Sequence, residues 1–172
     1  TSTAEYNLAV GTTALDAITT GDKNVAVGYD ALTANTTGTR NIAMGYGALD
    51  APDTENDNLA IGYDALGGAI AGGEFNVAIG NYSLDANTSG GNHTAVGYQS
   101  LSANTSGDNN TAVGYQSLSA NTTGADVTAF GYKALFANTT AERSTAFGSQ
   151  ALSSNTTGAA NTALGYYALQ AN

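Results

Sequence analysis

A tandem repeat of 17 residues constrains the fold of this chain more than any other feature. One glycine marks each copy, and the ten glycines are Gly11, Gly28, Gly45, Gly62, Gly80, Gly97, Gly114, Gly131, Gly148 and Gly165. Successive glycines lie 17 residues apart, except for one step of 18 between Gly62 and Gly80. An alanine always lies two residues before the glycine, and a leucine four residues after it. A unit this short cannot bury its own core, so the copies must stack and share one.

The first six positions of each unit alternate in the manner of a β-strand. In the copy at 110–115, asparagine, alanine and glycine alternate with threonine, valine and tyrosine. A second segment, such as 117–120, is expected to form another short strand after a bend. The sequence Asn-Thr-Thr-Gly then favours a turn. Helices are disfavoured, because each interior glycine would cost roughly 1 kcal/mol.

The pattern therefore predicts an all-β fold, a parallel β-solenoid (β-roll) of ten 17-residue coils. Residues 1–172 form a single repetitive domain, which we expect to be a fragment of a longer fibre. Like residues should superpose from coil to coil, so that the leucines from Leu15 to Leu169 form an apolar column. An amide ladder is expected from Asn35, Asn87, Asn104, Asn121, Asn138, Asn155 and Asn172. The column of alanine and glycine fits either the interior of the coil or an interface with a neighbouring chain.

Charge and composition restrict the partners. The net charge is −10, which disfavours binding to nucleic acid or to an anionic membrane surface. Most of it lies in residues 1–86, which carry 11 acidic and 2 basic side chains. The chain contains no cysteine, so disulfides and cysteine-based metal sites are excluded. No apolar run is long enough for membrane insertion.

Several copies resemble the repeats of known surface fibres. Asn-Val-Ala-Val-Gly at 24–28, Asn-Leu-Ala-Ile-Gly at 58–62 and Asn-Val-Ala-Ile-Gly at 76–80 resemble the head repeats of trimeric autotransporter adhesins. Thr-Ala-Val-Gly-Tyr-Gln-Ser-Leu-Ser-Ala-Asn-Thr-Ser-Gly at 94–107 is closer to the related β-roll repeats of bacteriophage tail fibres. The present unit is longer than that of the adhesin heads, and its extra residues fall in the Asn-Thr-Thr-Gly turn.

The resemblance implies a left-handed roll assembled as a homotrimer. It also implies an extracellular location, on a bacterial cell surface or a virion tail. The corresponding function is a structural or adhesive fibre segment that mediates attachment to a host or surface, with a cell-surface glycan or protein as receptor.

Catalytic chemistry is not expected. His93 is the single histidine and replaces a repeat asparagine, so it is interpreted as a surface variant. The serines, threonines and tyrosines that could suggest catalysis recur at repeat positions, which indicates structural roles. We therefore expect neither enzymatic activity nor a cofactor.

The third copy carries an acidic cluster in place of its turn. Asp50, Asp53, Glu55 and Asp57 supply oxygen atoms that could bind Ca²⁺. Their spacing matches neither an EF-hand nor the Gly-Gly-x-Gly-x-Asp calcium roll, and a solvated turn is the favoured interpretation. The next turn, 67–74, contains the one-residue insertion and is expected to be a bulged surface loop.

One repeat position carries a column of tyrosines. If exposed, the column would form an aromatic stripe suited to binding sugars; if buried, it would fill the core. The members are Tyr29, Tyr46, Tyr63, Tyr98, Tyr115, Tyr132 and Tyr166.

Threonine columns suggest ice binding as the alternative function. The turn aligns Thr36, Thr88, Thr105, Thr122, Thr139 and Thr156. The second position of the unit adds Thr94, Thr111, Thr128, Thr145 and Thr162, and the first five coils have Leu8, Val25, Ile42, Leu59 and Val77 there. This exchange favours an inward or half-buried second position, which argues against a selected ice-binding plane.

Overall fold

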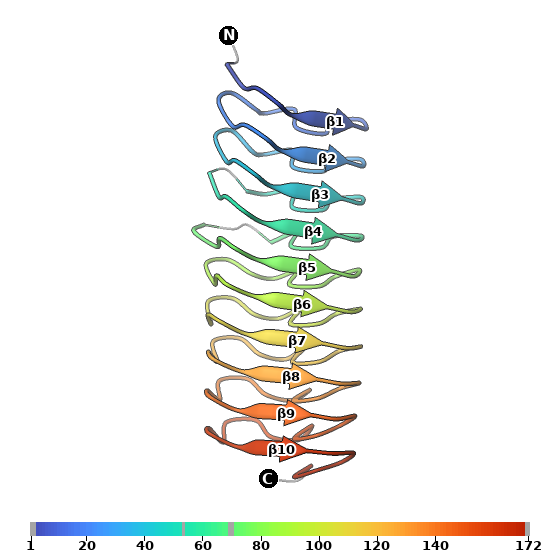
Figure 1. The fold of residues 1–172 in the computed structure, drawn as a ribbon, viewed down its shortest axis with the longest axis vertical. Helices are drawn as coiled ribbons and strands as arrows, with labels where there is room; N and C mark the ends of the chain where they lie inside the picture. The colour runs from blue at the N-terminus through green and yellow to red at the C-terminus, as the bar shows by residue number, and fades with distance from the viewer. Residues whose placement is uncertain (1–2, 53, 69–70, 171–172) are drawn as a thin grey trace.

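The chain folds into a parallel β-solenoid with one short strand in each coil (Figure 1). This computed structural model describes residues 3–52, 54–68 and 71–170. Its ten strands are β1 (Leu8–Val10), β2 (Val25–Val27), β3 (Ile42–Met44), β4 (Leu59–Ile61), β5 (Val77–Ile79), β6 (Thr94–Val96), β7 (Thr111–Val113), β8 (Thr128–Phe130), β9 (Thr145–Phe147) and β10 (Thr162–Leu164). They form a single sheet in chain order, which confirms the predicted solenoid class.

Strand register follows the sequence period. Each strand residue pairs with its equivalent one coil later, as Ala112 does with Ala129. The 18-residue step is absorbed outside the sheet, because Leu59 still pairs with Val77. The inserted residue falls in 67–74, but residues 69 and 70 lie outside the described part of the chain, so the predicted bulged loop is covered only in part.

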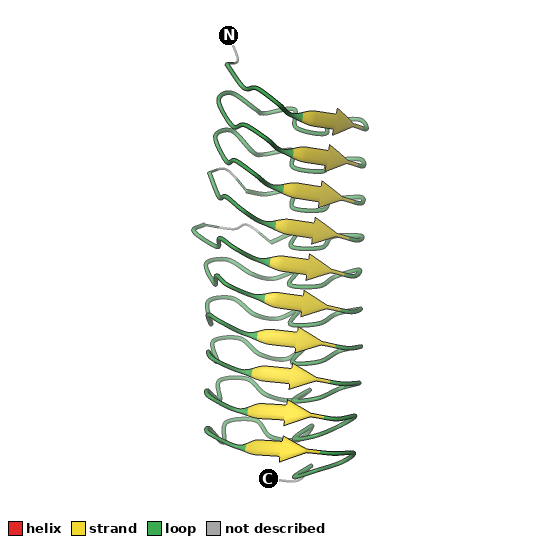
Figure 2. Cartoon of the chain, in the orientation of Figure 1, coloured by secondary structure: helices red, strands yellow, loops and turns green. Residues whose placement is uncertain are grey.

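The expected second strand does not form. The segments between the strands are turns and bends, so the sheet occupies only one side of the solenoid (Figure 2). In the seventh coil Gln116 has φ 52° and Leu118 has φ 53°. All ten repeat leucines share this left-handed conformation, with φ between 48° and 54°. Extended geometry is impossible with such angles, although backbone hydrogen bonds still join neighbouring coils, as from Leu118 N–H to Ala134 O at 2.9 Å.

The interior holds the leucine and alanine columns. The repeat leucines from Leu32 to Leu152 are fully buried, as are the strand alanines from Ala26 to Ala146. The alanine column thus lies inside its own coil and is not available to a neighbouring chain. Small side chains are needed there, because the thin coil leaves little space between the sheet and the opposite wall.

Two asparagine ladders run through the solenoid. The predicted ladder forms at the turn from Asn87 to Asn155, where for example Asn121 Nδ2 donates to Asn104 Oδ1 at 2.9 Å and to Gly124 O at 3.0 Å. Asn35 is not joined to this series, and its Nδ2 donates to Gly38 O within its own turn. Asn172 lies outside the described residues. A second ladder precedes the strands: Asn110 Oδ1 accepts the backbone N–H of Val127 at 3.0 Å. These buried amides satisfy backbone groups that the short strands leave unpaired.

Candidate functional site

The outer face of the sheet carries a row of exposed and half-buried apolar side chains. In each strand the central alanine points inward, so the residues on either side of it point outward. Among these outward side chains, Leu8 is 51% exposed, Met44 41% and Phe147 51%. None of the outward positions in β1 to β10 carries a charge. We call this surface the outer sheet face.

The repeat tyrosines are exposed and stacked on one another. Tyr29 and Tyr46 have ring centroids 5.1 Å apart at 15°, and Tyr46 and Tyr63 are 5.0 Å apart at 6°. Tyr98, Tyr115 and Tyr132 form a second stack with spacings of 5.5 Å. The exposed alternative for this column is therefore the correct one, with each of these six tyrosines 41% to 49% exposed.

Tyr82 joins the two stacks, and the repeat alignment missed it. This residue lies one position after the usual tyrosine, where the coil has Asn81. Its ring centroid is 5.3 Å from that of Tyr63 and 6.1 Å from that of Tyr98, in tilted and edge-on geometry. Tyr166, 74% exposed, packs edge-on against Tyr167 instead of joining the stacks. We call the series from Tyr29 to Tyr132, including Tyr82, the tyrosine ladder.

Stacking determines what the tyrosine ladder can bind. A ring within a stack has neighbouring rings over both faces, so its edge and hydroxyl are what it presents to solvent. A sugar normally packs its apolar C–H face against a free aromatic face. Within each stack the middle ring, Tyr46 or Tyr115, therefore offers a phenol edge and hydroxyl, whereas the rings at the ends are stacked on one face.

The acidic cluster is divided among different partners. Asp57 accepts two hydrogen bonds from the guanidinium of Arg40, at 2.6 and 2.7 Å, which lower the pKa of its carboxyl. Glu55 is buried, and its carboxylate accepts the backbone N–H of Gly72 at 2.9 Å. Asp53 lies outside the described residues. Within 3–52, 54–68 and 71–170, no three acidic or histidine side chains gather in a metal-binding arrangement.

Asp50 belongs to a different group of carboxylates. Burial raises its pKa, and the negative charges of Asp64, Asp30 and Asp85 raise it further. The pKa of Asp85 is raised by burial and by Asp64 as well. These side chains come from successive coils, so stacking brings like charges together in the acidic half of the solenoid.

His93 is buried, and its interpretation as a surface variant is wrong. Only 1% of this residue is exposed. Its ring takes the place of an amide in the second asparagine ladder: Nδ1 accepts the backbone N–H of Asn110 at 3.2 Å. Nε2 lies 3.1 Å from Asn104 Nδ2. Burial lowers the pKa of His93 to about 4, so the side chain is neutral at physiological pH.

The two threonine columns differ in their surroundings. The turn threonines use their hydroxyls within the fold, since Thr105 Oγ1 donates to Thr122 O at 3.0 Å and Thr122 Oγ1 to Thr139 O at 3.0 Å. The threonines at the second position lie on the outer sheet face, half-buried in β6 and β7 and exposed in β8 to β10. The expected inward alternative for this position is thus wrong, because the central alanine occupies the interior. The half-buried alternative is correct for β2 and for β4 to β7.

The fold defines the class of this protein as a parallel β-solenoid with an apolar outer sheet face and an exposed tyrosine ladder. No protein-family model, curated protein or solved structure matches the chain. Among the described residues, no helix has the length and apolar character required to cross a membrane.

Proposed function

We propose that this solenoid is a non-catalytic segment of an extracellular or virion fibre, assembled as a left-handed homotrimer that mediates attachment to a host or surface. The observation that carries the proposal is the uncharged, apolar outer sheet face. The sequence resemblance to adhesin heads and tail fibres supports the same function. A bacterial cell surface or a virion tail is the corresponding location, with a surface glycan or protein as receptor.

The outer sheet face has the composition of an interface. Val96 and Val113 are half-buried in the single chain, and Phe130 and Phe147 are 44% and 51% exposed, with rings stacked at 4.8 Å. A contiguous apolar surface this long is unusual on a monomer in water. Depletion of charge is typical of the centre of a protein–protein interface. Copies of the same chain would meet with equal coil spacing, which favours self-association along the whole length.

The trimer can be tested by sedimentation equilibrium and chemical crosslinking of the purified chain. We expect a particle of three times the chain mass of 17.1 kDa at micromolar concentration. Val113→Lys should yield monomers, because it places charges in the proposed interface. Thr123→Lys, at an exposed turn of the same part of the solenoid, is the matched control and should remain trimeric. A wild-type monomer at this concentration would contradict the trimer.

Ice binding remains the second candidate function. The observation in its favour is the outward column from Thr94 to Thr162, held in register by the strand pairing from β6 to β10. Regularly spaced hydroxyl and methyl groups on a flat face could order water in an ice-like lattice. The column is confined to β6 to β10, because β1 to β5 have apolar residues at this position, so the fibre function is the stronger proposal.

A further inference from the structure

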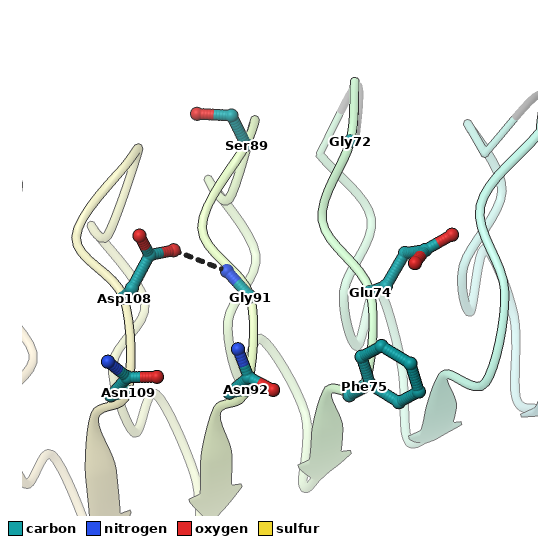
Figure 3. Close-up of a pocket in the computed structure, with 8 residues that line it drawn as sticks. All are labelled: Gly72, Glu74, Phe75, Ser89, Gly91, Asn92, Asp108 and Asn109. Carbon is teal, nitrogen blue, oxygen red and sulfur yellow. Dashed lines mark hydrogen bonds between the residues drawn. The ribbon is translucent and has the colours of Figure 1, made fainter.

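A shallow hollow of 350 Å³ lies at the turns that lead into β5, β6 and β7 (Figure 3). Equivalent positions in three successive coils carry Glu74, Gly91 and Asp108. Gly91 has no side chain, so none stands between those of Glu74 and Asp108. The Asp108 carboxylate accepts the backbone N–H of Gly91 at 2.8 Å. The Glu74 carboxylate points away from Gly91 and accepts from Asn56 Nδ2 at 2.7 Å (Figure 3).

The next residue in each of these coils forms another edge of the hollow. These residues are Phe75, Asn92 and Asn109, and Figure 3 shows them in a row. Asn92 presents an amide group that can both donate and accept hydrogen bonds. Asn109 Nδ2 already donates to Asp126 Oδ1 at 3.0 Å, so Asn109 offers its amide oxygen as an acceptor. The hollow therefore combines one aromatic ring with two amides and one carboxylate, that of Asp108, because the Glu74 carboxylate points away (Figure 3).

Phe75 has no evident role in the fold. Its backbone has φ 60°, a conformation that is uncommon for bulky residues. Its side chain is 56% exposed, so it contributes little to the core. Among the described residues, the rings that stack on one another do not include Phe75. Other coils have Lys23, Arg40 or Arg143 at this position, which shows that the turn itself does not require an aromatic ring.

We propose that this hollow binds a neutral pyranose sugar. The C–H face of the sugar packs on the free face of Phe75, and its hydroxyls exchange hydrogen bonds with Asn92, Asn109 and the carboxylate of Asp108. The volume is near the lower end of the roughly 300–1,000 Å³ found for ligand sites, which suits a single sugar ring. Glu74 and Asp108 repel acidic sugars, so the specificity is for uncharged ones. The biological role of this site rests on the proposed attachment function, whereas sugar binding itself is tested independently of that function.

The experiment is saturation-transfer NMR on the full chain with methyl glycosides of glucose, galactose, mannose, N-acetylglucosamine and sialic acid. We expect one or more neutral glycosides to bind and the sialoside not to bind. Phe75→Asn should weaken binding by about tenfold, since it removes the aromatic face. Asparagine already occupies the equivalent positions 92 and 109 at φ 61° and 58°, so this variant keeps the backbone geometry. Arg143→Asn, at the same position four coils later, is the matched control and should bind as the wild type does.

Three results would overturn the proposal: no binding of any neutral glycoside, equal binding by Phe75→Asn and wild type, or preferential binding of the sialoside. A triple alanine variant of Tyr98, Tyr115 and Tyr132 separates the hollow from the tyrosine ladder. Circular dichroism first establishes that this variant is folded. The folded variant should bind normally, and a loss of binding confined to it would place the sugar on the ladder instead. Sedimentation of the same samples keeps the two proposals apart, because trimers that bind no neutral glycoside contradict only the sugar site.

Discussion

The surroundings of a single residue in this solenoid are set largely by the equivalent residues in the neighbouring coils. Gly114 has φ 134°, and a Cβ atom there would lie 2.5 Å from the carbonyl oxygen of Gly131. His93 replaces a ladder asparagine and keeps the acceptor that Asn110 needs. Substitutions at such positions disturb two neighbouring coils at once. They should therefore lower the free energy of unfolding more than the small or polar character of these residues suggests.

Gly114→Ala should lower the free energy of unfolding by about 2 kcal/mol or more, because it combines a strained backbone with a steric overlap. Urea denaturation followed by circular dichroism measures the change. Thr123→Ala, at an exposed turn of the same part of the solenoid, should cost less than about 0.5 kcal/mol. Equal stability of Gly114→Ala and wild type would show that the glycine column is not required.

His93 should make the protein less stable in acid. Its pKa is about 4 in the folded chain and 6.5 in the unfolded chain, so the unfolded chain binds more protons between these values. The stabilisation is fully present above pH 6.5 and is lost as the pH falls towards 4, by roughly 3 kcal/mol at about 1.4 kcal/mol per pKa unit. Asp108 opposes the shift in pKa but does not cancel it.

The measurement compares wild type with His93→Asn, which restores the repeat residue. Unfolding free energies at a series of pH values between 4 and 7.5 should show the two proteins diverging as the pH falls, with the variant favoured in acid. The aspartates with raised pKa values are present in both proteins, so their contribution cancels in the difference. A constant difference across this range would contradict the burial of a neutral imidazole.

At the scale of the element, each coil combines a three-residue strand with a wall of turns. Each strand from β2 to β10 buries one alanine, whereas all three residues of β1 are exposed. The residues on either side of the alanines are half-buried or exposed, so the strands form a flat face but little core. The leucines at positive φ supply the core from the opposite wall. The tyrosine ladder lies outside both and adds ring contacts between successive coils.

Tyr115→Ala should destabilise the solenoid by about 2 kcal/mol, because Tyr115 stacks on both Tyr98 and Tyr132. Thermal or urea denaturation of the variant gives the change. Tyr6, which is 79% exposed, provides the control, and Tyr6→Ala should be nearly neutral. If Tyr115→Ala and Tyr6→Ala had the same free energy of unfolding, the tyrosine ladder would not stabilise the solenoid, and binding would be its remaining role.

At the scale of the whole molecule, the acidic and apolar surfaces are separate. The charged side chains of the described residues lie outside the strands, whereas the outer sheet face of all ten strands is uncharged. A fibre can therefore associate through the sheet while the turns keep it in solution. Ice binding would require the same sheet to face water.

Thermal hysteresis separates these two uses of the sheet. We expect the purified chain at millimolar concentration to show no freezing-point gap and no faceting of ice crystals, because threonine occupies the second position in only five of the ten strands. A measurable gap that is abolished in a Thr111→Leu and Thr128→Leu double variant would instead assign the sheet to ice. Both threonines lie on the outer sheet face, and leucine already occurs at this position in β1 and β4.

The sequence by itself determined the solenoid, because residues at a constant interval must superpose when short units stack. The period placed the strands, the leucine column and the asparagine ladder at the turn. Only the tertiary structure decided which columns face inward, since alternation defines two sides of a strand but does not distinguish the interior from the surface. Closure of the coil determines which side is the interior, because the leucines adopt positive φ and fill the space opposite the alanines. The second position of the unit therefore lies outside, and His93 lies inside. The position of Tyr82 in the tyrosine ladder and the hollow beside Phe75 both arise from residues that depart from the repeat. The repeat pattern does not predict them, because they depend on contacts between neighbouring coils.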